Sequence, residues 1–161
     1  MATTHDPISH EPLGLPEGCY VVTSSSESQR GGVLVRWVQQ CAESPPLIAV
    51  SVPKRHSVAP MVRDSGVFSV CLIDPSDTAC IRAFGTPRAP DEQEELFDSF
   101  PSYRLVTGAP VLRRAVKAFD CELTRHVDID SDYELFVGRV VGVTIRESNG
   151  NVRHLRLPKA S

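Results

Sequence analysis

The residues best suited to binding chemistry form the segment Lys54-Arg55-His56-Ser57, directly before a predicted helix. Ser57 is a plausible N-cap, Pro60 lies in the first turn and Gly66 marks a stop, so the helix is expected over 58–65. A phosphate at such a helix start is stabilised by free N–H groups, the helix dipole, a hydroxyl and nearby cations. The segment is therefore a candidate phosphate site. The alternative is a solvated basic turn in which Ser57 is an ordinary cap.

A polar interruption marks segment 33–41, where Arg36, Gln39 and Gln40 stand among strand-forming residues. Arginine supplies five donors and a fixed charge, and glutamine both donates and accepts hydrogen bonds. These side chains could bind a polar ligand from a strand. The alternative is structural: residues 33, 35 and 37 share one face, so Arg36 points outward to a surface carboxylate and the glutamines end the strand in solvent.

Composition excludes several classes of function. The chain has 17 Lys plus Arg against 20 Asp plus Glu, a net charge of −3 without a basic block, which disfavours nucleic-acid binding. The start of the chain lacks the order of a signal peptide and no apolar stretch is long enough to span a membrane, so we expect a cytoplasmic protein. Five cysteines without a C-x-x-C pair and five scattered histidines predict no metal site.

The remaining pattern predicts many strands and few helices within one domain. Arg30-Gly31-Gly32 is predicted as the turn of a hairpin, the run 47–52 as a strand buried on both faces, and Asn149-Gly150 as a second hairpin turn. A second helix is expected to start at Pro75 behind Asp74 and to end at Gly85, and 86–110 is expected to leave the sheet. The predicted strands are 19–25, 33–41, 47–52, 67–73, 115–129, 133–147 and 151–158. This order favours a closed or nearly closed antiparallel barrel with short inserted helices.

The order of segments is also that of a known family. The stretches "GGVLVRWVQQCAESPPLIAVSV", "PKRHS", "SGVFSVCLI" and "DYELFVGRVVG" occur in the sequence expected for flavin reductase-like proteins with an FMN-binding split barrel. The chain resembles this family from about Gly18 to Thr144, most specifically in W-x-x-Q-x-x-x-x-P-P-L-x-x-V-S-V over 37–52. Residues 1–17 are expected to form an N-terminal arm and 18–161 the domain. The resemblance implies a mainly β, antiparallel Greek-key split β-barrel and a homodimer with FMN, or alternatively FAD, bound near the subunit interface.

The resemblance further implies which residues bind flavin. Segment 35–41 would follow the flavin ring, Ser51 and Val52 would lie beside it, 54–57 would bind the phosphate, and Phe84 would approach the ring edge. Trp37 and Phe84 could instead fill the core, and Ser51 could bond its own backbone. The implied flavin-binding residues are Val35, Arg36, Trp37, Val38, Gln39, Gln40, Cys41, Ser51, Val52, Lys54, Arg55, His56, Ser57 and Phe84. No catalytic side chain is expected, because hydride transfer needs only correct placement of the nicotinamide against the flavin.

One position departs from the family pattern. The chain has Asp132-Tyr133 where many members have Asp-His. Tyr133 is expected to contact the nicotinamide substrate, but tyrosine cannot act as a cation. The leading hypothesis is an FMN-binding oxidoreductase in which NAD(P)H reduces a flavin that passes electrons to free flavin or a partner monooxygenase. The alternatives are an FMN-binding module without reductase activity and a barrel that has lost flavin and serves as an interaction protein.

Overall fold

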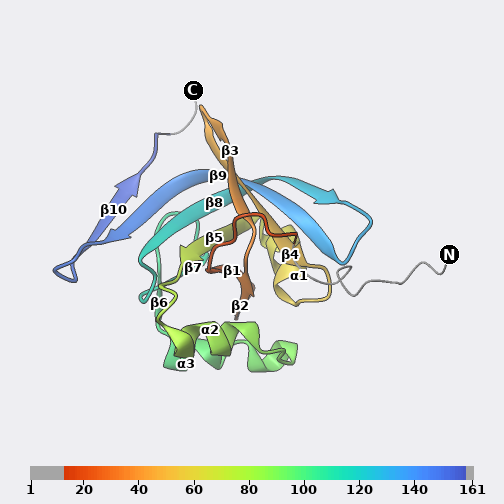
Figure 1. Ribbon diagram of the computed structural model, residues 1–161, viewed down its shortest axis with the longest axis horizontal. Coiled ribbons are helices and arrows are strands. Elements are labelled where there is room, and N and C mark those ends of the chain that lie inside the picture. Colours follow the sequence, from red (N-terminus) through yellow and green to blue (C-terminus); the bar gives the residue numbers. More distant parts are fainter. Residues whose placement is uncertain (1–12, 159–161) are drawn as a thin grey trace.

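The computed structural model describes residues 13–158, about half of which belong to antiparallel strands (Figure 1). Its helices are α1 (Val58–Ser65), α2 (Thr78–Gly85), the 3-10 helix η2 (Pro90–Glu92) and α3 (Leu96–Ser99). The strands are β1 (Tyr20–Ser26), β2 (Gln29–Val35), β3 (Val38–Glu43), β4 (Pro46–Pro53), β5 (Val67–Leu72), β6 (Ser102–Arg104), β7 (Pro110–Leu112), β8 (Lys117–Asp128), β9 (Tyr133–Arg146) and β10 (Val152–Arg156). Residues 13–17 form neither helix nor strand; the rest of the predicted arm lies outside the described residues.

One sheet of eight strands dominates the structure. Seven of its strands follow the order β2-β1-β5-β8-β9-β4-β3, β10 pairs with β9, and β6 and β7 form a separate pair. All strand pairs are antiparallel. The long strands β8 and β9 arch across the upper part of the view with β3 projecting beyond them, while α2 and α3 lie together at the opposite end (Figure 1). The predicted mainly antiparallel β class with short inserted helices is confirmed, although the sheet is not closed.

Apolar side chains form two buried clusters on the sheet. The first includes Val50, Phe68 and Phe136 and packs against α1. The second includes Phe84 and Phe97 and joins α2 and α3 to the sheet. The segment from α2 to β7 therefore has its own buried apolar cluster, which holds it in place outside the main sheet.

The predicted strand 33–41 is wrong as one element, because the chain leaves the sheet at Arg36 and Trp37 and divides into β2 and β3. Strand β4 lies between β9 and β3 as a central strand should, but its side chains alternate between buried and partly exposed. The prediction that it is buried on both faces is therefore wrong. Its second face carries Leu47, Ala49 and Ser51, which are only half-buried in this chain.

The prediction of a turn at Arg30-Gly31-Gly32 is also wrong, because these residues lie within β2 and Glu27, at a φ of 57°, makes the turn. The glycines have a packing role instead. A Cβ on Gly31 would lie 2.9 Å from the Met61 sulfur of α1, and one on Gly32 would lie 2.6 Å from the Phe84 ring of α2. Successive strand residues point to opposite faces, so α1 and α2 pack on the two faces of β2.

The helix ends agree only in part with the predictions. Helix α1 covers the predicted 58–65 and ends at Gly66, whose φ of 70° suits glycine. Helix α2 begins three residues later than predicted, because Asp77 rather than Asp74 accepts a hydrogen bond from a helix N–H, that of Cys80, at 3.3 Å. The predicted turn before β10 is confirmed, with Gly150 at a φ of 87°.

The segment after α2 is held against the open edge of β2. The Gly32 N–H donates to the buried Gln93 carboxamide at 3.2 Å, and the Arg30 N–H donates to Glu94 at 2.7 Å. These two side chains thereby accept hydrogen bonds from backbone N–H groups that have no neighbouring strand at the edge of the sheet. Within residues 13–158, no helix is long and apolar enough to cross a membrane.

Candidate functional site

A cleft of about 1010 Å³ runs past β2 from α1 to α2. Its walls are the β1–β2 turn, the loop between β4 and α1 with the outer face of α1, and the end of α2 with the following segment, and Tyr133 of β9 also lines it. The lining residues are Ser26, Glu27, Ser28, Gln29, Val33, Leu34, Pro53, Lys54, Arg55, His56, Ser57, Pro60, Met61, Arg63, Asp64, Phe84, Gly85, Thr86, Pro87, Arg88, Pro90 and Tyr133. The glycines that let both helices approach β2 therefore also bring the cleft walls together.

The loop between β4 and α1 leaves one hydroxyl without a partner. Ser57 precedes α1 but does not cap it, because the Ala59 N–H donates to the His56 carbonyl at 3.1 Å and Pro60 has no N–H to donate. The Val58 N–H donates to His56 Nδ1, also at 3.1 Å. The Ser57 oxygen is buried and makes no hydrogen bond within the described part of the chain. Burial lowers the pKa of His56, which favours the neutral ring that this acceptor role requires. The sequence prediction placed the helix start correctly but not the side-chain cap.

Two cationic residues of the same loop, Lys54 and Arg55, line the cleft together with Ser57. Lys54 lies 2.5 Å from Asp128 of β8, and this hydrogen bond raises the pKa of Lys54. Its backbone N–H donates to Asp132 at 3.0 Å, which fixes the loop to the β8–β9 turn. Arg55 is exposed beside it. Because a buried hydroxyl and fixed positive charge favour a bound anion, the residues present fit the phosphate of a nucleotide.

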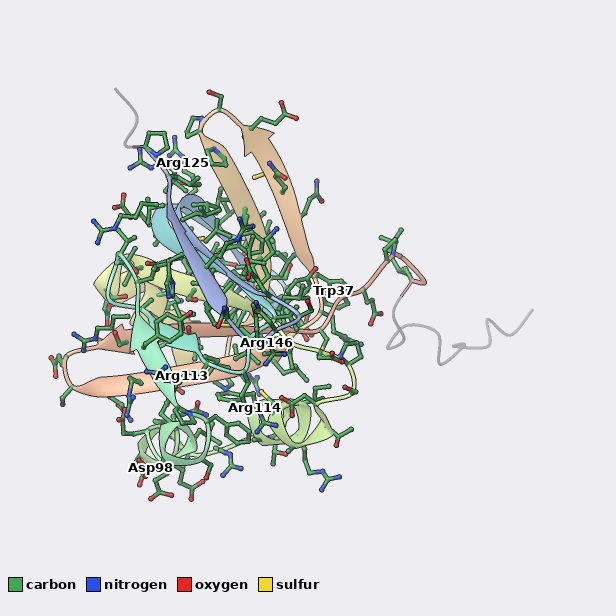
Figure 2. All side chains as sticks on the ribbon, turned by 90° about the vertical axis from the view of Figure 1, so that its left-hand side faces the viewer. Trp37, Asp98, Arg113, Arg114, Arg125 and Arg146 are labelled. Carbon is green, nitrogen blue, oxygen red and sulfur yellow. The ribbon has the colours of Figure 1, made fainter. Side chains whose placement is uncertain are left out.

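Arg36 and Trp37 lie at the base of the projecting β3–β4 hairpin, where Figure 2 labels Trp37. The Arg36 guanidinium lies 4.7 Å from the Trp37 ring and 3.9 Å from a Glu17 oxygen, and its side chain is 44% exposed. This is the outward orientation expected from strand alternation. Trp37 in turn meets Tyr133 edge-on, with ring centroids 5.3 Å apart, so it supports a side chain that lines the cleft.

Six of the predicted site residues line the cleft together. They are Lys54, Arg55, His56, Ser57, Phe84 and Tyr133. Phe84 is 2% exposed and also packs edge-on against Phe100, so it serves the core as well.

The other predicted site residues lie elsewhere, and their contact with a flavin stays a prediction. They are Val35, Arg36, Trp37, Val38, Gln39, Gln40, Cys41, Ser51 and Val52. Val35 and Val52 belong to the core, whereas Gln39, Gln40 and Cys41 are exposed on β3, which is an end strand of the sheet.

The sequence predictions missed other parts of the cleft, notably the β1–β2 turn, Arg63 and Arg88. One signal pointed toward Arg63. In β9, Glu134 and Phe136 are two positions apart and therefore point to the same face of the sheet, which is buried. A carboxylate on a buried face needs a cationic partner. Its identity could not be predicted, because Arg63 lies 71 residues earlier in the chain.

Comparison with known proteins agrees with this architecture. Residues 13–156 match the model of the flavin reductase like domain. The chain belongs to this family. It is 32% identical over 123 residues to the FMN reductase (NADH) RutF of Ancylobacter novellus, a match that covers 76% of this chain and 66% of that protein. It is 28% identical over 130 residues to the ferric-chelate reductase (NAD(P)H) of Archaeoglobus fulgidus, covering 80% of this chain and 75% of that one.

Solved structures share the fold. An FMN-binding protein from Thermus thermophilus with bound 1-cyclohex-2-enone superimposes with a TM-score of 0.78 at 19% identity, covering 100% of this chain and 97% of that one. BorF, the flavin reductase component of a bacterial two-component tryptophan halogenase, gives a TM-score of 0.69 at 25% identity, covering 88% and 92%. These neighbours confirm the predicted split-barrel class for this member of the flavin reductase like family.

Proposed function

We propose that this family member is a flavin reductase that binds FMN non-covalently and reduces it with NAD(P)H. The observation that carries the proposal is the cleft loop at α1, where the buried Ser57 hydroxyl has no partner among the described residues and follows Lys54, Arg55 and His56 in the cleft lining. Family membership and the relatives named FMN reductase (NADH) and ferric-chelate reductase (NAD(P)H) support the same activity.

The residues of the loop have separate tasks in this proposal. Ser57 donates to a phosphate oxygen, Lys54 is held in place by Asp128, and the neutral His56 fixes the turn that presents Ser57. A flavin bound there supplies the two-electron chemistry, accepting hydride from a nicotinamide and passing electrons onward. The protein's contribution is to orient both ring systems and restrict water between them.

Tyr133 and Phe84 are proposed to flank the reacting rings. Tyr133 lines the cleft and its ring is braced by Trp37 at a centroid distance of 5.3 Å. An aromatic side chain with a fixed plane can pack against a nicotinamide without losing conformational freedom on binding. Tyr133 therefore positions the substrate and is not assigned a proton-transfer role.

The acceptor is proposed to be free flavin that leaves for a partner monooxygenase. BorF, a structural neighbour, is the flavin reductase component of a two-component tryptophan halogenase, so a reductase of this fold can supply a separate flavin-using enzyme. We further propose a homodimer, because within residues 13–158 β3 is an end strand of the sheet, and it exposes Gln39 and Gln40 of the predicted flavin-binding segment. Light scattering during size-exclusion chromatography measures the molar mass in solution and so tests the proposed dimer.

A second candidate is an FMN-binding module that lacks reductase activity. The observation that favours it is Tyr133, which occupies the cleft where the sequence resemblance anticipated histidine. The two candidates share the phosphate loop and differ only in whether a nicotinamide can react beside the bound flavin.

A steady-state assay separates these candidates. We expect NADH or NADPH consumption that saturates with added FMN and vanishes without flavin. Protein that binds FMN yet consumes neither nicotinamide would support the module, and protein that binds no flavin would support the third hypothesis of an interaction protein. A preparation freed of flavin and then reconstituted serves as the control for contaminating enzymes.

A further inference from the structure

A buried carboxylate of β9 holds a cation at the cleft wall. Glu134 is 4% exposed, and its Oε1 accepts a hydrogen bond of 2.5 Å from Arg63 Nη1 on α1. His126 Nε2 lies 3.2 Å from the same oxygen, with its ring stacked on Phe136. A buried carboxylate needs such partners, and here they limit the positions that Arg63 can take.

A second carboxylate beside Glu134, at the end where the paired strands β8 and β9 meet their connecting turn, also binds a cation of the cleft wall. These two paired strands are called the β8–β9 ribbon below. Asp128 and Glu134 are directly paired across the two strands. Asp128 binds Lys54 and Glu134 binds Arg63, each at 2.5 Å, and both cations line the cleft. The ribbon therefore fixes two positive charges in one wall of the cleft, and only Lys54 belongs to the loop assigned to the flavin phosphate.

Arg63 lies further along α1 than the loop assigned to the flavin phosphate. It follows Ser57 by six positions, so the two backbones are about 9 Å apart along the helix axis. Its side chain is 38% exposed, and within residues 13–158 only Nη1 donates a hydrogen bond. The other guanidinium N–H groups are free to bind a second anion at a separate point of the cleft.

The cleft has room for such a ligand. Pockets of roughly 300–1,000 Å³ typically enclose a small organic ligand, and this cleft measures about 1010 Å³. On the opposite wall, Arg88 is exposed and donates only to the Ala83 carbonyl within the described chain. The cleft lining also holds the carboxylates Glu27 and Asp64, but its four Lys and Arg side chains outnumber them, so its net charge suits an extended, doubly charged anion.

We propose that Arg63 binds the diphosphate of a dinucleotide and that Glu134 is the positioning residue that aims it. The inference rests on the proposed function and deepens it, since NAD(P)H and FAD both carry a diphosphate that FMN lacks. Arg63 is thereby a specificity-determining residue for dinucleotides. Glu134 acts through Arg63 and does not touch the ligand.

The test uses Arg63→Gln, Glu134→Gln and the double variant of the full chain. Isothermal titration calorimetry measures the dissociation constants of FMN, FAD, NAD⁺ and NADP⁺, and steady-state assays measure KM and kcat for NADH. The matched controls are Arg139→Gln and Glu122→Gln, an exposed ion pair of β8 and β9 at 3.3 Å that does not line the cleft. Thermal unfolding confirms that each variant is folded, and the surface position of Arg63 keeps that variant usable if Glu134→Gln is unstable.

We expect Arg63→Gln to weaken at least one dinucleotide by roughly tenfold to a hundredfold while the FMN constant stays near wild type. Weaker FAD binding assigns the diphosphate to the flavin, and weaker NAD⁺ or NADP⁺ binding with a higher KM at unchanged kcat assigns it to the nicotinamide. Glu134→Gln should show the same pattern severalfold more weakly, and the double variant should resemble Arg63→Gln alone, because one residue acts through the other.

Three results would overturn the proposal: wild-type dinucleotide affinities in Arg63→Gln, equal losses for FMN and the dinucleotides, or a wild-type protein that binds no dinucleotide. Failure of the proposed function has a different signature. In that case NAD⁺ or FAD binding still depends on Arg63, but neither NADH nor NADPH reduces the bound flavin.

Discussion

Replacing Ser57 with alanine should change stability and ligand affinity in opposite directions. Within residues 13–158 of the ligand-free protein, the Ser57 hydroxyl is buried without a hydrogen bond, and it makes no cap to α1. An unsatisfied buried polar group costs about 1–3 kcal/mol. Removing the hydroxyl should therefore stabilise the ligand-free chain, and at the lower limit of about 1 kcal/mol the Tm should rise by about 2–4 °C.

Binding of FMN should become weaker in the same variant. A hydrogen bond to a charged group contributes about 1.5–3 kcal/mol, which corresponds to a roughly tenfold to hundredfold increase in Kd. Riboflavin has the same ring without the phosphate, so its Kd should not change. Quenching of flavin fluorescence measures both constants, and differential scanning calorimetry measures the Tm.

Ser65, at the other end of α1, provides the matched control. Its hydroxyl donates to the Val67 carbonyl at 3.2 Å, so Ser65→Ala should lower the Tm and leave FMN affinity unchanged. The reasoning is refuted if Ser57→Ala lowers the Tm as the loss of a helix cap would. It is equally refuted if FMN and riboflavin lose affinity to the same extent.

Three further changes test the loop, the core and the substrate face. Burial lowers the pKa of His56 in the folded protein, so folding favours the neutral ring, and the stability this gives is lost as the pH falls below the pKa of His56 in the unfolded chain. The variant His56→Asn keeps an acceptor for the Val58 N–H, so its Tm should fall less than that of the wild type between neutral and mildly acidic pH. An equal fall in Tm would count against this role of His56. Gly138→Ala should cost about 1–3 kcal/mol, because its Cβ would lie 2.5 Å from the Phe68 ring, and an unchanged denaturation midpoint would contradict this. Tyr133→Ala should raise the KM for NADH by roughly tenfold, whereas Tyr133→Phe should not, because the aromatic ring is the packing surface. Similar KM values for the two variants would show that Tyr133 is not part of the substrate site.

Local sequence patterns were sufficient for most strands and for α1. The β-branched runs and the Asn149-Gly150 turn have causes that lie within a few residues, and those predictions agree with the structure. The glycines of β2 were misplaced, because Gly31 and Gly32 are required by side chains of α1 and α2, which are distant in sequence. A turn and a close helix contact select glycine equally, and only the tertiary arrangement separates them.

The candidate site was predictable to a similar extent. The basic segment before α1 could be found from residue types alone, whereas the unpaired state of Ser57 depends on the Ala59 N–H donating to the His56 carbonyl instead. The partnership of Arg63 with Glu134 depends on how β9 packs against α1. Segment 35–41 was assigned by resemblance; its Gln39 and Gln40 are exposed on β3, an end strand of the sheet, and Arg36 lies between β2 and β3.

An anaerobic titration of the FMN-loaded protein with NADH and then NADPH tests the central claim most directly. If the cleft places a nicotinamide against the flavin, the visible absorbance of the bound flavin should be lost in proportion to the nicotinamide added to an FMN-saturated sample. Flavin that keeps its absorbance with both nicotinamides, yet loses it with a chemical reductant, would contradict the reductase assignment while leaving an FMN-binding protein.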